Sequence, residues 1–118
     1  MKIAIDRMNL LRPLSHINSV VERRNTIPIL SNVVLNATSE QLSFTATDMD
    51  MDIVTTTPCS VSNEGATTIP AHLLFEIVKK LPDGAEVQIK VSDGHAQVSA
   101  GRSSFNLPIL PVEDFPAI

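Results

Sequence analysis

The stretch of sequence that decides the fold is residues 35–53, LNATSEQLSFTATDMDMDI. Its pattern recurs at residues 89–107, IKVSDGHAQVSAGRSSFNL, at a constant offset of 54 and without a gap. The matching positions are Leu35 with Ile89, Ala37 with Val91, Phe44 with Val98, Ala46 with Ala100, Met51 with Phe105, and Ile53 with Leu107. Order and spacing that repeat in this way indicate an internal duplication.

Alternation of polar and apolar residues predicts three strands in each copy, because side chains on a strand point to opposite faces in turn. In the first copy we expect strands at 33–37, 42–46 and 49–55, and in the second at 86–91, 96–100 and 103–107. Two further short strands are predicted at 2–6 and 66–69, ahead of the two copies.

A helix is predicted between each early strand and the copy that follows it. At helical spacing, one stripe of residues 7–21 is apolar, and Pro13 should interrupt the regular hydrogen bonding there. Residues 71–81 form the second helix, which Pro82-Asp83-Gly84 ends. Its expected buried residues are Leu74, Ile77, Val78 and Leu81. The order strand, helix, three strands thus occurs twice. We expect an α+β domain with pseudo-twofold symmetry, in which two helices pack side by side on a curved antiparallel sheet.

Composition limits the class of protein. Of 118 residues, 43% are apolar, which is enough to form a core, and the net charge of −4 is too small for a disordered chain. The single cysteine excludes an intrachain disulfide, and four Phe without Trp or Tyr give little support to stacking of single-stranded bases. Without an apolar signal core or a long apolar run, we expect a soluble cytoplasmic protein with no membrane partner.

Positive charge is concentrated near the predicted helices. Six of the nine basic residues lie on or beside them: Arg7, Arg12, Arg23, Arg24, Lys79 and Lys80. The only acidic residues in the same segments are Glu22 and Glu76. A helix pair with this composition would present a positive face to a DNA duplex, whose field is screened over about 8 Å at physiological salt. The same pattern also occurs on ordinary solvated helix faces, so it leaves both interpretations open.

No motif for metal binding or catalysis is complete. Asp48, Asp50 and Asp52 resemble the start of a calcium loop, but Ile53 and Cys59 occupy the positions where that loop needs Gly and Glu. His16, His72 and His95 lack the spacing of a zinc site, and Cys59 has no basic neighbour in sequence that would activate it. We therefore expect no cofactor, no metal and no catalytic residues.

Five segments together resemble one known family. They are VERRNTIPILSN (21–32), TATDMDM (45–51), GATTIPA (65–71), KLPDGA (80–85) and GRSSFNLP (101–108). In this order and spacing they resemble the first domain of the bacterial DNA polymerase III beta subunit, the replicative sliding clamp. The resemblance covers essentially the whole chain, so residues 1–118 are expected to be the first of three domains of a truncated longer protein.

The resemblance implies a function without chemistry. Members of the family form a head-to-tail dimeric ring around double-stranded DNA, with helices lining the hole and sheets outside. The ring holds the replicative polymerase at the primer end, which raises the local concentration of enzyme at its substrate. A second clamp protomer, the polymerase and the clamp loader are therefore the implied partners, together with DNA contacted through its phosphates.

The resemblance also implies roles for individual residues. Arg24 matches an arginine that touches the DNA backbone, and Arg23 beside it would support that contact. Arg12, His16, His72 and Lys79 are the expected hole-facing residues. Phe105 and Leu107 match the apolar pair that meets the other protomer, with Arg102 flanking and Ser104 where some relatives have a second arginine. From the residues alone, the period-two spacing of Phe105 and Leu107 fits either an interface or the core, and it favours the core.

Two alternative functions have different requirements. A self-contained interaction module would use the edge with Phe105 and Leu107 for a protein partner and bind no DNA. A small enzyme with its site at the helix pair would need a triad, a dyad or a metal set, and the sequence offers none.

Overall fold

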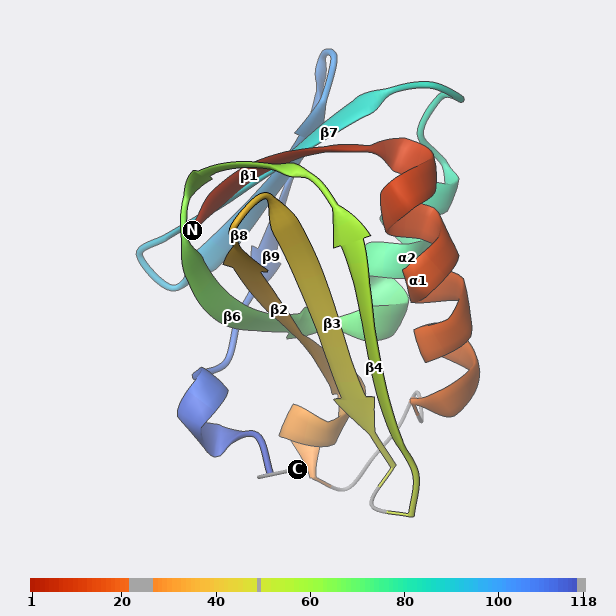
Figure 1. Cartoon of the computed structure of the whole chain (residues 1–118), viewed down its shortest axis with the longest axis vertical. Helices are drawn as coiled ribbons and strands as arrows, with labels where there is room; N and C mark the ends of the chain where they lie inside the picture. The colour runs from red at the N-terminus through yellow and green to blue at the C-terminus, as the bar shows by residue number, and fades with distance from the viewer. Residues whose placement is uncertain (22–26, 49, 117–118) are drawn as a thin grey trace.

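A computed structural model describes residues 1–21, 27–48 and 50–116 (Figure 1). The described residues contain two α-helices, α1 (Arg7–Val20) and α2 (Ala71–Lys79), and two short 3₁₀ segments, η1 (Pro28–Ser31) and η2 (Val112–Asp114). The strands are β1 (Lys2–Asp6), β2 (Asn32–Thr38), β3 (Gln41–Thr47), β4 (Asp52–Pro58), β5 (Ser60–Asn63), β6 (Gly65–Pro70), β7 (Glu86–Ser92), β8 (His95–Ala100) and β9 (Ser103–Pro108). The predicted order of strand, helix and three strands, occurring twice, is confirmed, with β5 added.

The strands form two antiparallel sheets rather than the single curved sheet that the sequence suggested. The first sheet has the order β5-β1-β7-β8-β9, and the second has the order β4-β3-β2-β6. The opening strand of each half pairs with the other half: Ile3 of β1 lies opposite Ile89 of β7, and Thr67 of β6 lies opposite Leu35 of β2. Each sheet is therefore completed by a strand that the opposite half contributes.

The offset of 54 holds for the first two strands of each copy. Leu35 pairs with Phe44 in the first hairpin of the duplication, and Ile89 pairs with Val98 in the second. The offset changes on the third strands, because Ala46 is opposite Ile53 while its equivalent, Ala100, is opposite Ser103. The β3–β4 connection is thus longer than the β8–β9 connection.

Because of this longer connection, the ungapped match of the third strands and the predicted start of β4 both need correction. Phe44 lies opposite Thr55 and Val98 lies opposite Phe105, so Thr55 and Phe105 are the equivalent positions. The ungapped match of Phe105 with Met51 was wrong, as was the match of Leu107 with Ile53, and β4 starts at Asp52 rather than at 49. The Asp48 carboxylate explains the delay, since it accepts hydrogen bonds from the backbone N–H groups of Asp50 and Met51 and closes a local turn.

The two helices differ in length and in how they begin. Asp6 caps α1 by accepting a hydrogen bond from the backbone N–H of Met8 at 3.1 Å. The helix continues through Pro13, whose ring is buried. In α2, Pro70 precedes the first turn without a side-chain cap, and the helix ends at Lys79 rather than at 81 because its last turn tightens, with the Lys80 N–H donating to the Ile77 carbonyl.

The helices lie together on one side of the sheets (Figure 1). The apolar stripe of each helix and the inner faces of both sheets form one core. Leu10, Leu14, Ile17, Leu74 and Val78 are fully buried as expected, whereas Ile77 is only half-buried. The core therefore fixes which helix faces remain available to a ligand.

Candidate nucleic-acid interface

Arg12 and His16 form an exposed pair on α1. They are four residues apart and so lie on the same face of the helix. Together with Asn9 and the β4 residues Thr55, Thr56 and Thr57, they line a shallow groove of about 250 Å³. Both were predicted from the sequence to face the DNA, and both side chains are accessible for that purpose.

Lys79 is the matching cation at the end of α2. Its side chain is half exposed, with Nζ 3.4 Å from the Glu76 carboxylate and 5.3 Å from the centre of the Phe75 ring. An exposed ion pair of this kind contributes little to stability and is easily exchanged for another partner. Lys79 can therefore turn to an anionic ligand at low cost.

His72 lies between the helices rather than on their open face. One ring nitrogen contacts the Asn18 side-chain oxygen, and Nε2 lies 2.7 Å from the Val21 carbonyl oxygen. His72 was predicted to face the DNA, but both of its ring nitrogens have partners inside the fold. It connects the start of α2 to the end of α1.

Arg7 makes the corresponding connection at the other end of the helix pair. Its Nε donates to the Val78 carbonyl at 3.0 Å, Nη2 to the Lys79 carbonyl at 2.9 Å, and Nη1 to the Asp83 carboxylate at 2.9 Å. With 7% of its surface exposed, Arg7 is not part of the positive face to which sequence analysis assigned it. The guanidinium instead donates to carbonyl groups in the last turn of α2, where the end of the helix carries partial negative charge.

Arg23 and Arg24, the remaining predicted DNA contacts, lie outside the described residues. The described chain resumes with Ile27, ahead of η1.

The predicted ring edge is β9, one of the two outer strands of the first sheet. Phe105 is 38% exposed, whereas Leu107 is 2% exposed and belongs to the core. The two side chains share a face of β9, but the rest of the domain covers Leu107 and leaves Phe105 partly exposed. The expected apolar pair is therefore reduced to Phe105 at the surface.

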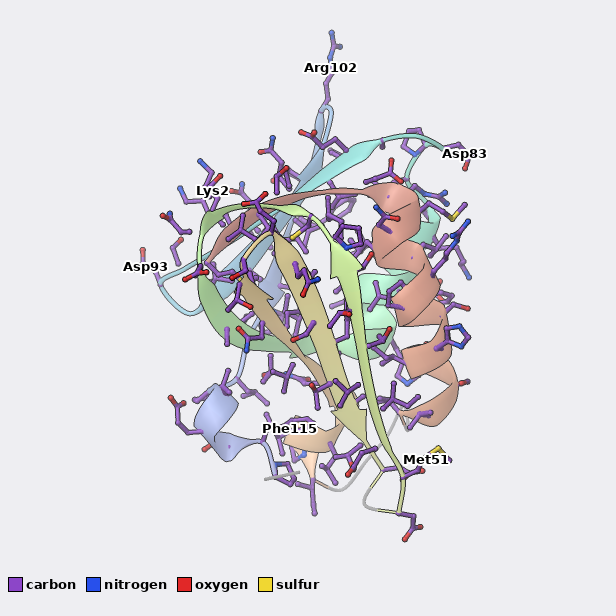
Figure 2. The ribbon with its side chains drawn as sticks, in the orientation of Figure 1. Lys2, Met51, Asp83, Asp93, Arg102 and Phe115 are labelled. Carbon is purple, nitrogen blue, oxygen red and sulfur yellow. The ribbon has the colours of Figure 1, made fainter. Side chains whose placement is uncertain are left out.

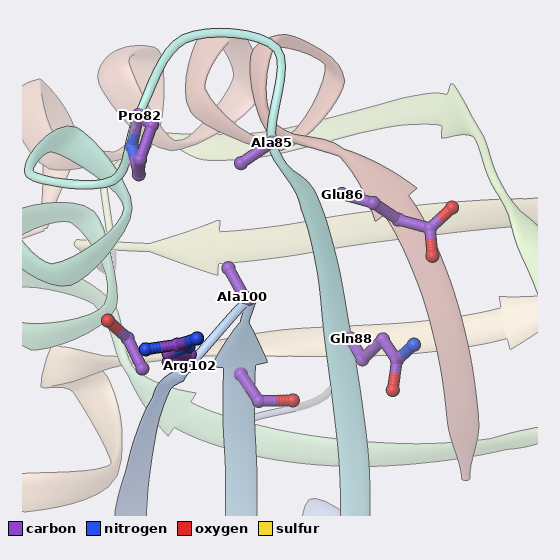
Figure 3. Close-up of a pocket in the computed structure, with 9 residues that line it drawn as sticks. Pro82, Ala85, Glu86, Gln88, Ala100 and Arg102 are labelled. Atoms are coloured by element: carbon purple, nitrogen blue, oxygen red, sulfur yellow. The ribbon is translucent and has the colours of Figure 1, made fainter.

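Arg102 occupies the tip of the β8–β9 turn and points away from the body of the domain (Figure 2). The preceding Gly101 has a φ of 57°, a left-handed conformation that glycine adopts without steric cost. Arg102 lines a groove of about 630 Å³, with Pro82, Ala85, Glu86, Gln88 and Ala100 among the other lining residues (Figure 3). Charge is thus available beside the β9 edge.

Other candidate groups have ordinary structural roles. Burial raises the pKa of the Cys59 thiol, and the nearby Glu40 carboxylate raises it further, which disfavours the reactive thiolate. Among the described residues, no three His, Cys, Asp or Glu side chains are grouped so that they could hold a metal ion. No helix in the described ranges is both long and apolar enough to cross a membrane.

A doubled strand–helix–three-strand unit, with paired helices on one side of two antiparallel sheets, defines the class of DNA-clamp domains. The chain belongs to the DNA polymerase III beta subunit family, because the model of that family's N-terminal domain matches residues 1–118.

Individual relatives agree with this assignment. The chain is 53% identical to the beta sliding clamp of Caulobacter vibrioides over 120 residues, and 39% identical to that of Escherichia coli over 117 residues. A crystal structure of the DNA polymerase sliding clamp from Caulobacter crescentus superimposes with a TM-score of 0.97 at 53% identity and covers the whole chain. A DNA polymerase III beta subunit from Pseudomonas aeruginosa superimposes with a TM-score of 0.95 at 39% identity, again over the whole chain.

The chain spans about a third of the length of these relatives, with 32% of each covered.

Proposed function

We propose that the chain is the first domain of a ring-shaped replication clamp, which encircles duplex DNA and tethers the replicative polymerase. The observation that carries this proposal is the position of β9, an outer strand with an exposed aromatic residue on a domain whose paired helices carry accessible cations. A link in a ring needs a surface for its neighbour and a surface for the enclosed ligand. The relatives are named as sliding clamps, and one as a DNA polymerase sliding clamp, which supports a clamp function in replication.

DNA contact in this proposal comes from Arg24 and Arg23, with Arg12, His16 and Lys79 on the helix pair. Arginine and lysine reach phosphate oxygens without reading base edges, so the contact is independent of sequence. Each phosphate neutralised releases counterions, which makes binding weaken steeply with salt. A ring held this way can slide.

Protomer contact comes from Phe105, with Arg102 beside it. An outer strand exposes backbone groups and an apolar side chain that a second protomer can cover, and an uncovered strand of this kind promotes aggregation. Leu107 makes no direct contact in this proposal, since its side chain is buried in the core.

The function so defined is binding and scaffolding in the cytoplasm, with no chemistry performed by this domain. Polymerase and clamp loader would bind the complete ring. In the full-length protein, topology rather than affinity retains the DNA, so a ring on closed circular DNA should survive a wash at high salt. The same ring should slide off a linear duplex, and the 118-residue chain alone should be retained on neither. Retention of the isolated chain on circular DNA would contradict the proposal.

The Arg24 contact is tested separately with Arg24→Ala in the full-length protein. We expect weaker binding to a duplex at low salt with unchanged dimerisation, measured by fluorescence anisotropy and by sedimentation. Unchanged affinity at low salt would remove Arg24 from the set of phosphate contacts.

A self-contained interaction module that uses the Phe105 edge and binds no DNA is the second candidate. The exposed ring of Phe105 favours a protein partner at this edge. An absence of duplex binding by the full-length protein at low salt would favour this alternative.

A further inference from the structure

The two helices are joined at both ends by contacts of the same kind. Arg7, in the first turn of α1, donates to the carbonyl groups of Val78 and Lys79 in the last turn of α2. His72, in the first turn of α2, contacts the Val21 carbonyl just after α1 and the Asn18 side chain in its last turn. In each case a nitrogen-bearing side chain at the start of one helix binds the end of the other.

These residues hold nearly equivalent positions in the duplication. Ile3 lies opposite Ile89 and Thr67 lies opposite Leu35, so a shift of 64 residues superimposes the strand before α1 on the strand before α2. Arg7 then corresponds to Ala71, one residue before His72. The same kind of contact therefore occurs at both ends of the antiparallel helix pair, made by an arginine at one end and by a histidine at the other.

The hydrogen bonds of Arg7 are of a strong kind, because the donor is charged and buried. Arg7 is almost fully buried, and each of its three guanidinium nitrogens donates to an oxygen atom at 2.9–3.0 Å. Hydrogen bonds from a charged group to carbonyl oxygens are stronger than neutral ones, and the end of a helix carries partial negative charge that a cation offsets. Sliding of one helix along the other would break contacts at both ends together.

The candidate DNA contacts lie between and beside these contacts. Lys79 supplies the carbonyl that Arg7 binds, so its backbone is held directly. His16 lies two residues before Asn18, and Arg12 lies one turn before His16 on the same helix. The relative placement of cations on the two helices therefore depends on the contacts of Arg7 and His72.

We propose that Arg7, His72 and Asn18 are positioning residues for the DNA-facing helix pair, and that they hold the cations of α1 and α2 at a fixed spacing without touching DNA. This inference rests on the proposed function. The positioning role can be distinguished from direct binding of DNA by His72. If His72 itself bound the phosphates, the uncharged Asn18 would be irrelevant to DNA affinity.

The test uses the full-length protein and a linear duplex, with affinity measured by fluorescence anisotropy between low and moderate salt. Three variants weaken the connections: Asn18→Ala, His72→Gln and Arg7→Lys, the last of which keeps the positive charge but loses the planar fork. Asn36→Ala is the matched control, because Asn36 is exposed on β2. Thermal unfolding and sedimentation of each variant establish that the ring is folded and dimeric.

We expect Asn18→Ala and His72→Gln each to weaken duplex binding several-fold, and the double variant to be no weaker than either alone because both residues act in one contact. The plot of log affinity against log salt should become shallower by about 0.9 for each phosphate that the variant no longer neutralises. Arg7→Lys should act in the same direction, and Asn36→Ala should match the parent protein.

An unchanged affinity and salt slope in folded Asn18→Ala would overturn the inference, as would a lower melting temperature with an unchanged slope. If Arg7→Lys does not fold, the Asn18 and His72 variants still decide the matter. Failure of the proposed function gives a different result, because Arg12→Ala and Lys79→Ala would then leave duplex binding unchanged as well.

Discussion

The edge strands β4 and β9 hold equivalent positions in the duplication but carry different side chains at these positions. Thr55 of β4 corresponds to Phe105 of β9, and Thr57 corresponds to Leu107, by their pairing with the preceding strands. The α1 residues Asn9, Arg12 and His16 line a groove with threonines of β4, so that edge is polar where it meets α1, although Val54 of the same strand is also exposed. The β9 edge carries an exposed aromatic ring instead.

The helices differ in the same sense. Under the shift of 64 residues, Asn9 corresponds to Leu73 and Arg12 corresponds to Glu76. Leu73 is 44% exposed, so apolar surface replaces an amide at an equivalent place on α2. Both copies keep the order of strand, helix and three strands around one shared core, while they present different chemistry to their surroundings.

The largest expected effect is on stability, and it comes from the buried residue of β9. Leu107→Ala should lower the free energy of unfolding of the 118-residue chain by about 2–5 kcal/mol, because it leaves a cavity beneath the first sheet. Thr57→Ala at the equivalent position of β4 should cost about 1 kcal/mol. Urea unfolding measures both values, and equal losses would mean that the two edges are supported alike.

Phe105→Ala is expected to affect assembly more than folding. In the full-length protein, loss of the exposed aromatic residue at the proposed protomer contact should weaken dimerisation by about 2 kcal/mol, roughly thirtyfold. The control is Thr55→Ala on β4, which should leave the dimer dissociation constant unchanged in sedimentation experiments. A dimer insensitive to Phe105→Ala would break the contrast between the two edges.

Arg12→Ala and Glu76→Ala test the two helices at equivalent positions with opposite charges. Arg12→Ala should weaken duplex binding by about 1 kcal/mol and reduce the salt slope by about 1. Glu76→Ala should leave binding unchanged or strengthen it slightly, because it removes an anion and frees the Lys79 ammonium group. If both substitutions weakened binding, charge on the helix pair would not be what holds the duplex.

The smallest effect concerns Cys59, just after β4. Its raised pKa means that, as pH rises, the unfolded chain loses the thiol proton before the folded chain does, so stability should decline slightly above the usual thiol pKa. Below that pH the thiol should react slowly with iodoacetamide. Glu40→Gln should speed the reaction modestly at pH 8, since it removes the secondary cause of the shift. If Cys59 in the parent protein reacted with iodoacetamide as fast as a free thiol, the prediction of a protected thiol would be wrong.

Local patterns predicted most of the secondary structure, because apolar periodicity and helix-ending residues act over short distances. The two helices and eight of the strands follow from such patterns. The bounds of β4 were missed because Asp48 closes a turn through its side chain, and an ungapped match to the second copy gives no sign of the extra residues. Strand β5 was missed because four residues with few apolar side chains give little periodicity.

Long-range pairing could not be predicted in the same way. Nothing local to β1 or β6 indicates that each strand completes the sheet of the other half, since the partners are far away in sequence. The roles of Arg7 and His72 were missed for the same reason, because their partners lie on the other helix. Phe105 and Leu107 have identical spacing signals, and only the packed structure distinguishes the exposed residue from the buried one.

The crossing of β1 and β6 between the halves has a mechanical consequence. A load applied to β9 passes through the hydrogen-bonded ladder of the first sheet to β1, and from there along the covalent chain into α1. The two halves therefore cannot swing apart as jaws do, because moving one would tear a strand from the sheet of the other. The domain behaves as a stiff link, and an assembly built from such links can flex only at the joints between them.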